Sequence, residues 1–202
     1  MTRVGRGDGG GDGGVGGGGG GAPTAGAAVG SAGGAARMIP STLVYVERGE
    51  AVLMLRKARG HQMGMWNGLG GKAEPGEMPE ACAVREVREE AGLEVTDLRY
   101  RGLIVFPRFD GLNDWYVWVY LASADGTPVS GDEGEVAWVD RADLADLDLH
   151  EGDRTFLPWL WQRELTFSAR FDYEDGRFQG HEVAFYPGAG SSGPGRGGRA
   201  DG

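Results

Sequence analysis

Residues 69–95 read LGGKAEPGEMPEACAVREVREEAGLEV, and this stretch places many acidic side chains directly after a glycine-rich loop. Three of its seven glutamates, Glu86, Glu89 and Glu90, have the i, i+3, i+4 spacing that shares one face of a helix. Like charges at that spacing repel, so the arrangement destabilises the helix unless a cation lies among the carboxylates. Carboxylate oxygens favour hard divalent cations, Mg²⁺ above all, which also bind substrate phosphates. The stretch therefore predicts a site for a metal ion and a polyphosphate.

The ends of this helix can be predicted from the residues at its boundaries. Pro79 suits the first helical position, Glu80 suits the first turn and Gly92 suits a left-handed cap. We therefore expect a helix from Pro79 to about Ala91. Met78 would be its N-cap and is a local misfit, because its side chain accepts no hydrogen bond from the backbone. The face opposite the acids is apolar and comprises Ala83, Val84, Val87 and Ala91.

The rest of the central region predicts strands on either side of a second helix. A hairpin is expected over 41–58, with a type II′ turn at Gly49 and Glu50. Further strands are expected at 98–109, 114–123 and 135–140, and a terminal hairpin turns near Asp175 and Gly176. The second helix is expected over 153–165, with a buried stripe of Phe156, Leu157, Leu160 and Trp161. This order of elements predicts an α+β fold, a mixed-sheet sandwich with a helix on each side.

Glycine is distributed very unevenly along the chain. Of its 40 glycines, 17 lie in residues 1–37 and 7 lie in residues 188–202. Neither end has the apolar periodicity needed to offset its ordering entropy by burial, so both are expected to be disordered tails. The first tail lacks the apolar core of a signal peptide, and an alternative start at Met38 would remove it. A single domain is expected at 38–187.

Charge and composition limit the kinds of partner. The formal net charge is -10, and residues 38–187 alone carry -12. A nucleic-acid polymer is therefore not an expected partner, because binding to its backbone needs a basic face, whereas a single nucleotide bridged by a metal ion remains compatible. The lone cysteine, Cys82, excludes an intramolecular disulfide and fits a reducing compartment. No apolar run reaches the length of a membrane span, so no membrane partner is expected, and the expected location is the cytoplasm. A monomer is expected, with a dimer as the alternative.

The stretch from Gly71 to Leu93 carries a resemblance. It matches the Nudix box, G-x5-E-x7-R-E-U-x-E-E-x-G-U with U a bulky aliphatic residue, at every position. The chain thus resembles the Nudix hydrolases. That resemblance implies an α/β/α sandwich with a mixed β-sheet between helices. It also implies Mg²⁺- or Mn²⁺-dependent attack of water on phosphorus in a nucleoside diphosphate linked to another group.

The resemblance also implies roles for the residues of the box. Metal binding falls to Glu86, Glu89 and Glu90, and one of these three, left open here, is the general base. The backbone carbonyl of Gly70 would complete the metal shell. An ion pair between Glu77 and Arg85 would hold the loop against the helix.

Over about 39–186 the chain resembles, more specifically, the MutT-type oxidised-purine nucleoside triphosphatases. The segments that carry this likeness are MWNGLGGKAEPGE, GLIVFPRF, GDEGEVAWVD, EGDRTFLPWL and ELTFSARFDY. They imply hydrolysis of nucleotides such as 8-oxo-dGTP to the monophosphate and pyrophosphate. The likeness implies base recognition by Asn67 and Asp153, hydrophobic pocket walls at Phe106 and Trp115, a polar pocket rim at Lys57, and an additional metal ligand at Glu133.

Plainer structural interpretations compete with several of these roles. Asn67 also suits a turn, and Asp153 also suits the N-cap of the second helix. Phe106 and Trp115 also suit the core of a sheet. Glu133 also suits an exposed loop, where it would be solvated.

Some positions leave the substrate open. His150 stands where the animal members carry a base-stacking tryptophan, and Gly152 replaces one of two adjacent pocket aspartates. Pro107 lies roughly where members acting on ADP-ribose carry a proline. ADP-ribose, a dinucleoside polyphosphate or a nucleotide sugar is therefore the alternative substrate. A non-catalytic sensor or scaffold is the remaining reading, although such proteins usually lose box glutamates.

Overall fold

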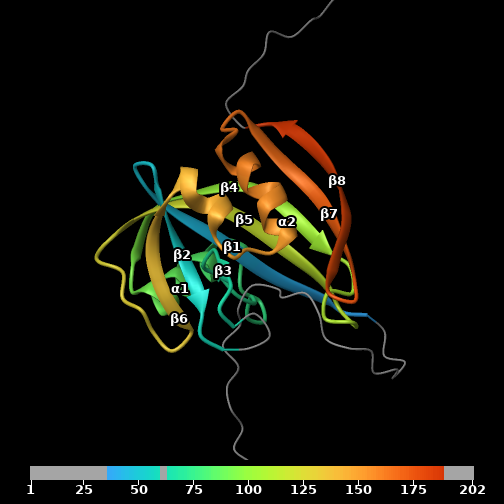
Figure 1. Cartoon of the computed structure of the whole chain (residues 1–202), viewed down its shortest axis with the longest axis horizontal. Coiled ribbons are helices and arrows are strands. Elements are labelled where there is room, and N and C mark those ends of the chain that lie inside the picture. Colours follow the sequence, from blue (N-terminus) through green and yellow to red (C-terminus); the bar gives the residue numbers. More distant parts are fainter. Residues whose placement is uncertain (1–35, 60–62, 189–202) are drawn as a thin grey trace, which may run out of the picture.

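The computed structural model of the chain describes residues 36–59 and 63–188 (Figure 1). The expected tails therefore lie almost entirely outside the described residues. None of the helices within the described ranges is long and apolar enough to cross a membrane. The elements, in chain order, are β1 (Met38–Arg48), β2 (Ala51–Lys57), β3 (Trp66–Asn67), α1 (Pro79–Ala91), β4 (Glu94–Phe106), β5 (Asp114–Asp125), β6 (Gly134–Asp140), η1 (Arg141–Asp146), α2 (Glu151–Phe156), η2 (Leu157–Trp161), β7 (Leu165–Glu174) and β8 (Arg177–Pro187).

One mixed sheet organises the molecule. Its order is β3-β2-β1-β5-β4-β7-β8, and β6 pairs with β2. The pairs β1/β5 and β4/β7 are parallel, and the other pairs are antiparallel. The predicted mixed sheet is confirmed. The terminal hairpin lies at one end of this sheet and β2 and β3 lie at the other (Figure 1).

The two faces of the sheet are covered by different helices. Along β1, Tyr45 packs in the same apolar cluster as Phe156 of α2, while its neighbour Val44 packs in a second cluster with Val87 of α1. Successive side chains of a strand point to opposite faces, so α1 and α2 lie on opposite sides of the sheet (Figure 1). The expected α/β/α sandwich is confirmed.

Helix α1 has the predicted ends. It begins at Pro79 and ends at Ala91. Gly92 follows with φ 66°, and its N–H donates to the carbonyl of Arg88 at 2.9 Å, which closes the helix as a left-handed cap does. The N-cap Met78 makes no side-chain capping bond to any residue in the described part of the chain, as expected from its side chain. The weak N-terminal cap is thus a real feature of this helix.

The second helix differs from its prediction. The α-helical part begins at Glu151, two residues earlier than expected, and ends at Phe156, where a 3₁₀ turn takes over until Trp161. Pro158 explains the change, because a proline inside an α-helix has no N–H and clashes with the preceding turn. Leu165 begins β7 instead of ending the helix. The predicted stripe is otherwise buried, with Trp161 only partly so.

Both predicted hairpin turns are present. Gly49 has a positive φ of 62° between β1 and β2, as the first central residue of a type II′ turn requires. Between β7 and β8, Asp175 and Gly176 have φ values of 49° and 74°. Positive φ at both central residues matches the twist of the flanking strands.

Candidate active site

The glycine-rich loop reaches the acidic helix through Gly70. The N–H of Gly70 donates to Oε2 of Glu90 at 2.7 Å. Gly70 has φ 137°, and a Cβ there would lie 2.3 Å from the carbonyl oxygen of Thr42 in β1. Only glycine fits such an approach. The loop is held on β1 by a bond from the N–H of Thr42 to the carbonyl of Gly71 at 2.8 Å.

Arg85 organises the start of the acidic helix. Its guanidinium makes two bonds of 2.9 Å to the two carboxylate oxygens of Glu77, so the predicted ion pair is confirmed. Its other contacts go to Glu86 at 2.7 Å, Glu89 at 3.1 Å and the carbonyl of Lys72 at 3.1 Å. The hydrogen bonds from Arg85 lower the pKa of Glu77 to about 2. A bidentate pair of this kind fixes the loop geometrically as well as electrostatically.

The three box carboxylates lie in different environments. Glu86 and Glu90 are buried, and Glu89 is exposed. Burial raises the pKa of Glu86. Burial also raises the pKa of Glu90 to about 7, against the opposing effects of Lys57 and of the Gly70 N–H. Glu90 is therefore a desolvated acid at the contact between the glycine-rich loop and α1.

Lys57 lies at the acidic helix, not at the rim of an aromatic pocket as expected. Its Nζ is 3.8 Å from Oε1 of Glu90, and both side chains are buried. Lys57 points to the face of β2 that holds Leu53 and Leu55, which pack in the α1 cluster, whereas Met54 packs on the α2 side. The predicted position of Lys57 was beside Phe106 and Trp115, which pack in the α2-side cluster.

Glu133 comes to the same region from the loop before β6. Its carbonyl accepts from the N–H of Ala58 at 3.0 Å, and its carboxylate contacts Arg59 at 3.3 Å. Its charge is close enough to contribute to the raised pKa of Glu90. The fold therefore brings Glu133 near the acidic helix although 43 residues separate it from Glu90 in the sequence.

The donor set fits a divalent cation. It contains carboxylates and a backbone carbonyl, which are the oxygen ligands that Mg²⁺ takes. Glu90 is buried beside further acids with a single lysine at 3.8 Å, so the cluster carries an excess of negative charge. In the described residues, however, no three acidic, histidine or cysteine side chains converge on one point, and Arg85 holds Glu86 and Glu89. Arg85 contacts one oxygen of each carboxylate, Oε1 of Glu86 and Oε2 of Glu89, so the other oxygen of each remains for a cation.

On the α2 face, Asp153 lies in a buried polar environment. It is the third residue of α2, and the N-cap is His150, so the N-cap interpretation of Asp153 is wrong. The backbone of His150 hydrogen-bonds the carboxyl group, as a capping-box acid does. Burial raises the pKa of Asp153 to about 7. Its Oδ2 has no hydrogen-bond partner among the residues that the structure describes.

Phe106 and Trp115 lie in strands that were predicted, whereas Asn67 lies in a short strand, β3, that was not. Asn67 ends β3, is buried, and accepts a 2.8 Å bond from the N–H of Gly68. Phe106 and Trp115 face each other across β4 and β5 and are part of the α2-side cluster. The indole N–H of Trp115 donates to Asp110 at 3.3 Å, which fixes the ring. Both aromatic residues are thus core residues in this structure, on the face where Asp153 lies.

Two tyrosines near Asp153 were missed by the sequence analysis. Tyr45 of β1 is fully buried, and Tyr173 of β7 is half-buried. Burial raises the pKa of each phenol, and the charge of Asp153 adds to the effect in both. The ring of Tyr45 lies so close to Gly68 that a Cβ there would be 3.0 Å from it. Alternating strand patterns gave no signal for either residue, since tyrosine is common in strands.

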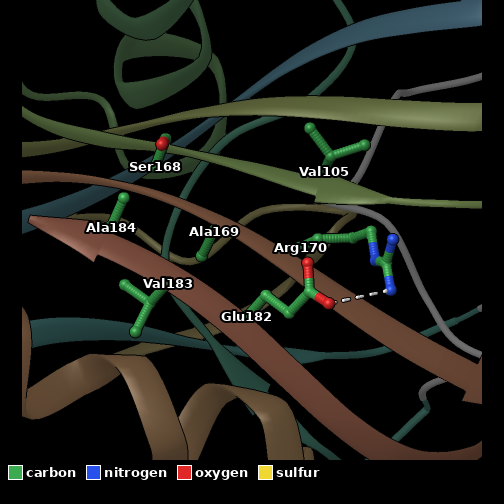
Figure 2. Close-up of a pocket in the computed structure, with 7 residues that line it drawn as sticks. All are labelled: Val105, Ser168, Ala169, Arg170, Glu182, Val183 and Ala184. Carbon is green, nitrogen blue, oxygen red and sulfur yellow. Dashed lines mark ion pairs between the residues drawn. The ribbon is translucent and has the colours of Figure 1, made fainter.

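A separate hollow lies on the terminal hairpin. Figure 2 shows that Val105 of β4 and residues of β7 and β8 line it. Its charged groups, Arg170 and Glu182, approach within 3.5 Å of each other, and Arg170 also contacts Asp172. The hollow is near the end of the sheet farthest from β2 and β3. It is therefore no part of the site formed by the loop and α1.

Comparison with known proteins decides the family. Residues 38–160 match the model of the NUDIX domain. The chain belongs to the Nudix family. It is 37% identical over 137 residues to the mouse oxidized purine nucleoside triphosphate hydrolase, and the aligned segment covers 66% of this chain and 86% of the mouse protein. It is 34% identical over 143 residues to the zebrafish (Danio rerio) protein of that name, which covers 70% of this chain and 88% of the relative.

A solved structure supports the fold of this Nudix hydrolase. The MutT protein from Bacillus halodurans superposes with a TM-score of 0.64, over 72% of this chain and 97% of that protein, at 22% sequence identity. At that identity the likeness concerns the fold. Nudix hydrolases generally use divalent metal ions and act on small nucleotides, which agrees with the acidic helix of this chain.

Proposed function

We propose that this Nudix hydrolase converts oxidised purine nucleoside triphosphates, such as 8-oxo-dGTP, to the monophosphate and pyrophosphate. The observation that carries the proposal is the buried carboxyl of Asp153, whose Oδ2 has no partner in the described part of the chain. It lies beside buried aromatic rings on the face opposite the acidic helix. An acidic helix beside a glycine-rich loop, together with a buried carboxyl oxygen that has no partner among the described residues, suits a nucleotide. The similarity to the mouse and zebrafish hydrolases supports the same substrate class.

The nucleobase would bind on the α2 face. Asp153 would accept hydrogen bonds from N–H groups of the base, and the amide of Asn67 would donate and accept at the purine edge. Phe106 and Trp115 would form apolar walls. A buried acceptor left without a partner costs about 1 to 3 kcal/mol, and a bound base would recover part of that cost.

The polyphosphate would bind at the loop and α1. Glu86, Glu89, Glu90 and Glu133, with the carbonyl of Gly70, would hold Mg²⁺ or Mn²⁺. Such an ion, when bound, neutralises phosphate charge and lowers the pKa of the attacking water. Arg85 and the N–H of Gly70 hold these carboxylates in place before the substrate arrives.

The proton of the attacking water would go to one of the box glutamates. Glu86, Glu89 and Glu90 all remain candidates. Burial raises the pKa of Glu90 to about 7, which suits a general base, whereas Glu89 is the most accessible of the three side chains. Replacing each by glutamine and comparing the pH dependence of kcat/KM would separate a general base from a metal ligand. We further propose that residues 38–187 form the complete catalytic unit.

The test is a substrate panel. We would measure kcat/KM with Mg²⁺ for 8-oxo-dGTP, dGTP, ADP-ribose and a diadenosine polyphosphate, using the wild type and the Glu89→Gln variant. We expect 8-oxo-dGTP to exceed dGTP by tenfold or more and the variant to lose at least about 100-fold. A lead by ADP-ribose or the dinucleotide would retain the Nudix chemistry but reject the base pocket. Unchanged activity in Glu89→Gln would reject the metal assignment.

A further inference from the structure

The space into which a side chain at position 152 would extend is filled by Tyr173. A Cβ built on Gly152 would lie 2.3 Å from the hydroxyl oxygen of Tyr173 and 3.2 Å from the ring of Phe171. No side chain fits at 152 while Tyr173 keeps its place. The hydroxyl of Tyr173, delivered from β7, therefore occupies the space that a side chain next to Asp153 would take.

Tyr173 belongs to the proposed base pocket by its contacts. Its ring centroid lies 6.1 Å from that of Phe106 and 5.4 Å from that of Phe109. Phe109 in turn packs edge-on against Trp115. Tyr173 is half-buried, whereas Asp153 beside it is buried. Part of Tyr173 thus faces accessible space at the edge of this aromatic group.

The hydrogen bonding of Tyr173 leaves its proton available. The backbone N–H of Gly152 hydrogen-bonds the phenol oxygen. Burial and the charge of Asp153 both keep the phenol in its neutral form by raising its pKa. With the oxygen accepting from the backbone, the O–H is the group left to donate. Beside it, Oδ2 of Asp153 is an acceptor that lacks a partner within the described residues.

A donor next to an acceptor matches one kind of purine edge. Guanine-type bases present a carbonyl oxygen beside N–H groups, so the hydroxyl can donate to the oxygen while the carboxylate accepts from the N–H groups. Adenine-type bases present an amino group at the position of that oxygen and an acceptor nitrogen beside it. The same two protein groups would then face a donor and an acceptor in the wrong order.

On this basis, and resting on the proposed function, we propose that Tyr173 is a specificity-determining residue that selects guanine-type over adenine-type oxidised purines. Its hydroxyl donates to the carbonyl oxygen of the base, in the space left by Gly152. Asp153 accepts from the neighbouring N–H groups. The pocket therefore reads the base with one carboxylate and one phenol.

The experiment compares 8-oxo-dGTP with 8-oxo-dATP, which carry the same oxidation and differ in this edge. We would measure kcat and KM at pH 8 for the wild type, Tyr173→Phe and the control Tyr186→Phe. Tyr186 bonds to Ser168 on the outer face of the terminal hairpin. We expect Tyr173→Phe to lower kcat/KM for 8-oxo-dGTP about 5- to 10-fold, mainly through KM, as the loss of one hydrogen bond predicts. Turnover of 8-oxo-dATP should change less than twofold, and the control should change neither.

Other results would overturn the proposal. Equal losses for both substrates would indicate a purely structural role for the hydroxyl, and no loss for either would remove it from the pocket. Wild-type data decide the proposed function separately, since a wild type that does not prefer 8-oxo-dGTP over dGTP rejects both ideas. A measurement of Tm tests the geometry without activity: Gly152→Ala should destabilise the wild type more than it destabilises Tyr173→Phe, which lacks the clashing oxygen. Equal decreases would contradict the assigned contact.

Discussion

Burial of single polar groups decides much of the chemistry of this Nudix hydrolase. Asp153 and Glu90 lie on opposite faces of the sheet, and each has a pKa raised to about 7 by burial. They differ in their partners, since Glu90 has Lys57 and Gly70 beside it, whereas Oδ2 of Asp153 has none among the described residues. The first environment suits a charged ligand and the second suits a neutral base.

The raised pKa of Asp153 predicts a pH-dependent stability. Because the folded state holds the proton more tightly than the unfolded state, this carboxyl lowers stability progressively as the pH rises from about 4 to about 7. Asp153→Asn removes that loss. As the pH rises from about 4 to about 7, the free energy of unfolding of the variant should come to exceed that of the wild type by about 2 to 4 kcal/mol. Above that range the difference should stay constant. Urea unfolding without substrate at several pH values measures it.

A control and a contrary outcome define this test. Asp132→Asn changes an exposed acid and should alter stability by less than about 0.5 kcal/mol at each pH. A difference between Asp153→Asn and the wild type that stays constant from pH 4 to 8 would contradict the burial argument.

Gly70 gives a second prediction at this scale. Gly70→Ala places a Cβ 2.3 Å from the carbonyl oxygen of Thr42, at a φ of 137° that alanine rarely adopts. We expect a loss of about 3 kcal/mol or more, since the loop must leave β1. Gly131→Ala is the matched control, because a Cβ there meets no atom of the described residues within 4 Å. Chemical denaturation of both variants checks this, and equal stability of the two would refute it.

Sequence patterns predicted the positions of some of these residues and not of others. The shared helix face of Glu86, Glu89 and Glu90 follows from their spacing, which is local. The face of β2 on which Lys57 lies could not be predicted, because this strand is apolar on both faces and shows no alternation. Asp153 could not be separated from an N-cap residue, since the start of α2 depended on tertiary contacts. Tyr173 meets Gly152 only through the pairing of distant elements.

At the scale of elements, the loop and α1 form one clamped unit. Arg85 contacts Glu77, two box glutamates and the carbonyl of Lys72, so a single side chain joins the loop to the helix. The helix ends were predictable because Pro79 and Gly92 act through local backbone geometry. The end of α2 was predicted wrongly, although Pro158 was visible in the sequence, because its apolar stripe continued past the break.

Glu77→Gln tests whether the ion pair between Glu77 and Arg85 holds the loop to the helix. The pKa of Glu77 is lowered to about 2, so its ion pair contributes stability fully above about pH 4.5 and loses it as the pH falls towards 2. We expect the variant to be about 1 to 2 kcal/mol less stable at pH 7, after allowance for screening by solvent, and the difference to shrink below pH 4.5. Thermal or urea unfolding across this range measures both effects.

An exposed ion pair at the C-terminal end of α1 offers a matched control for the pair of Glu77 and Arg85. Glu94 forms a bidentate ion pair with Arg88, but both side chains are exposed. Glu94→Gln should leave stability almost unchanged, because exposed pairs contribute little. If the two variants lost equal stability, the bond between loop and helix would not be the source of the effect.

At the scale of the whole molecule, the sheet separates two groups of residues. The acidic unit lies on one face and the aromatic cluster of the α2 side lies on the other, and Asn67 ends β3 directly before the glycine-rich loop. The chain thus passes from β3 to the loop that contacts α1 within a few residues. Composition and strand order predicted this sandwich, whereas the joining of the two groups through β3 became visible only in the structure.

The terminal hairpin lies beyond the residues that match the family model, yet it supplies core residues. Phe167 and Phe171 of β7 are buried against Trp159 and Phe156. Removal of residues 165–202 would expose these contacts and remove Tyr173. We expect the shortened chain to lose cooperative unfolding, because each large buried aromatic side chain contributes several kcal/mol.

A chain limited to residues 38–187 should keep the Tm within about 2 °C and kcat/KM within about twofold, consistent with the proposed domain. Circular dichroism melts of both chains decide the matter: a cooperative melt after hairpin removal would show that the sandwich is complete without β7 and β8.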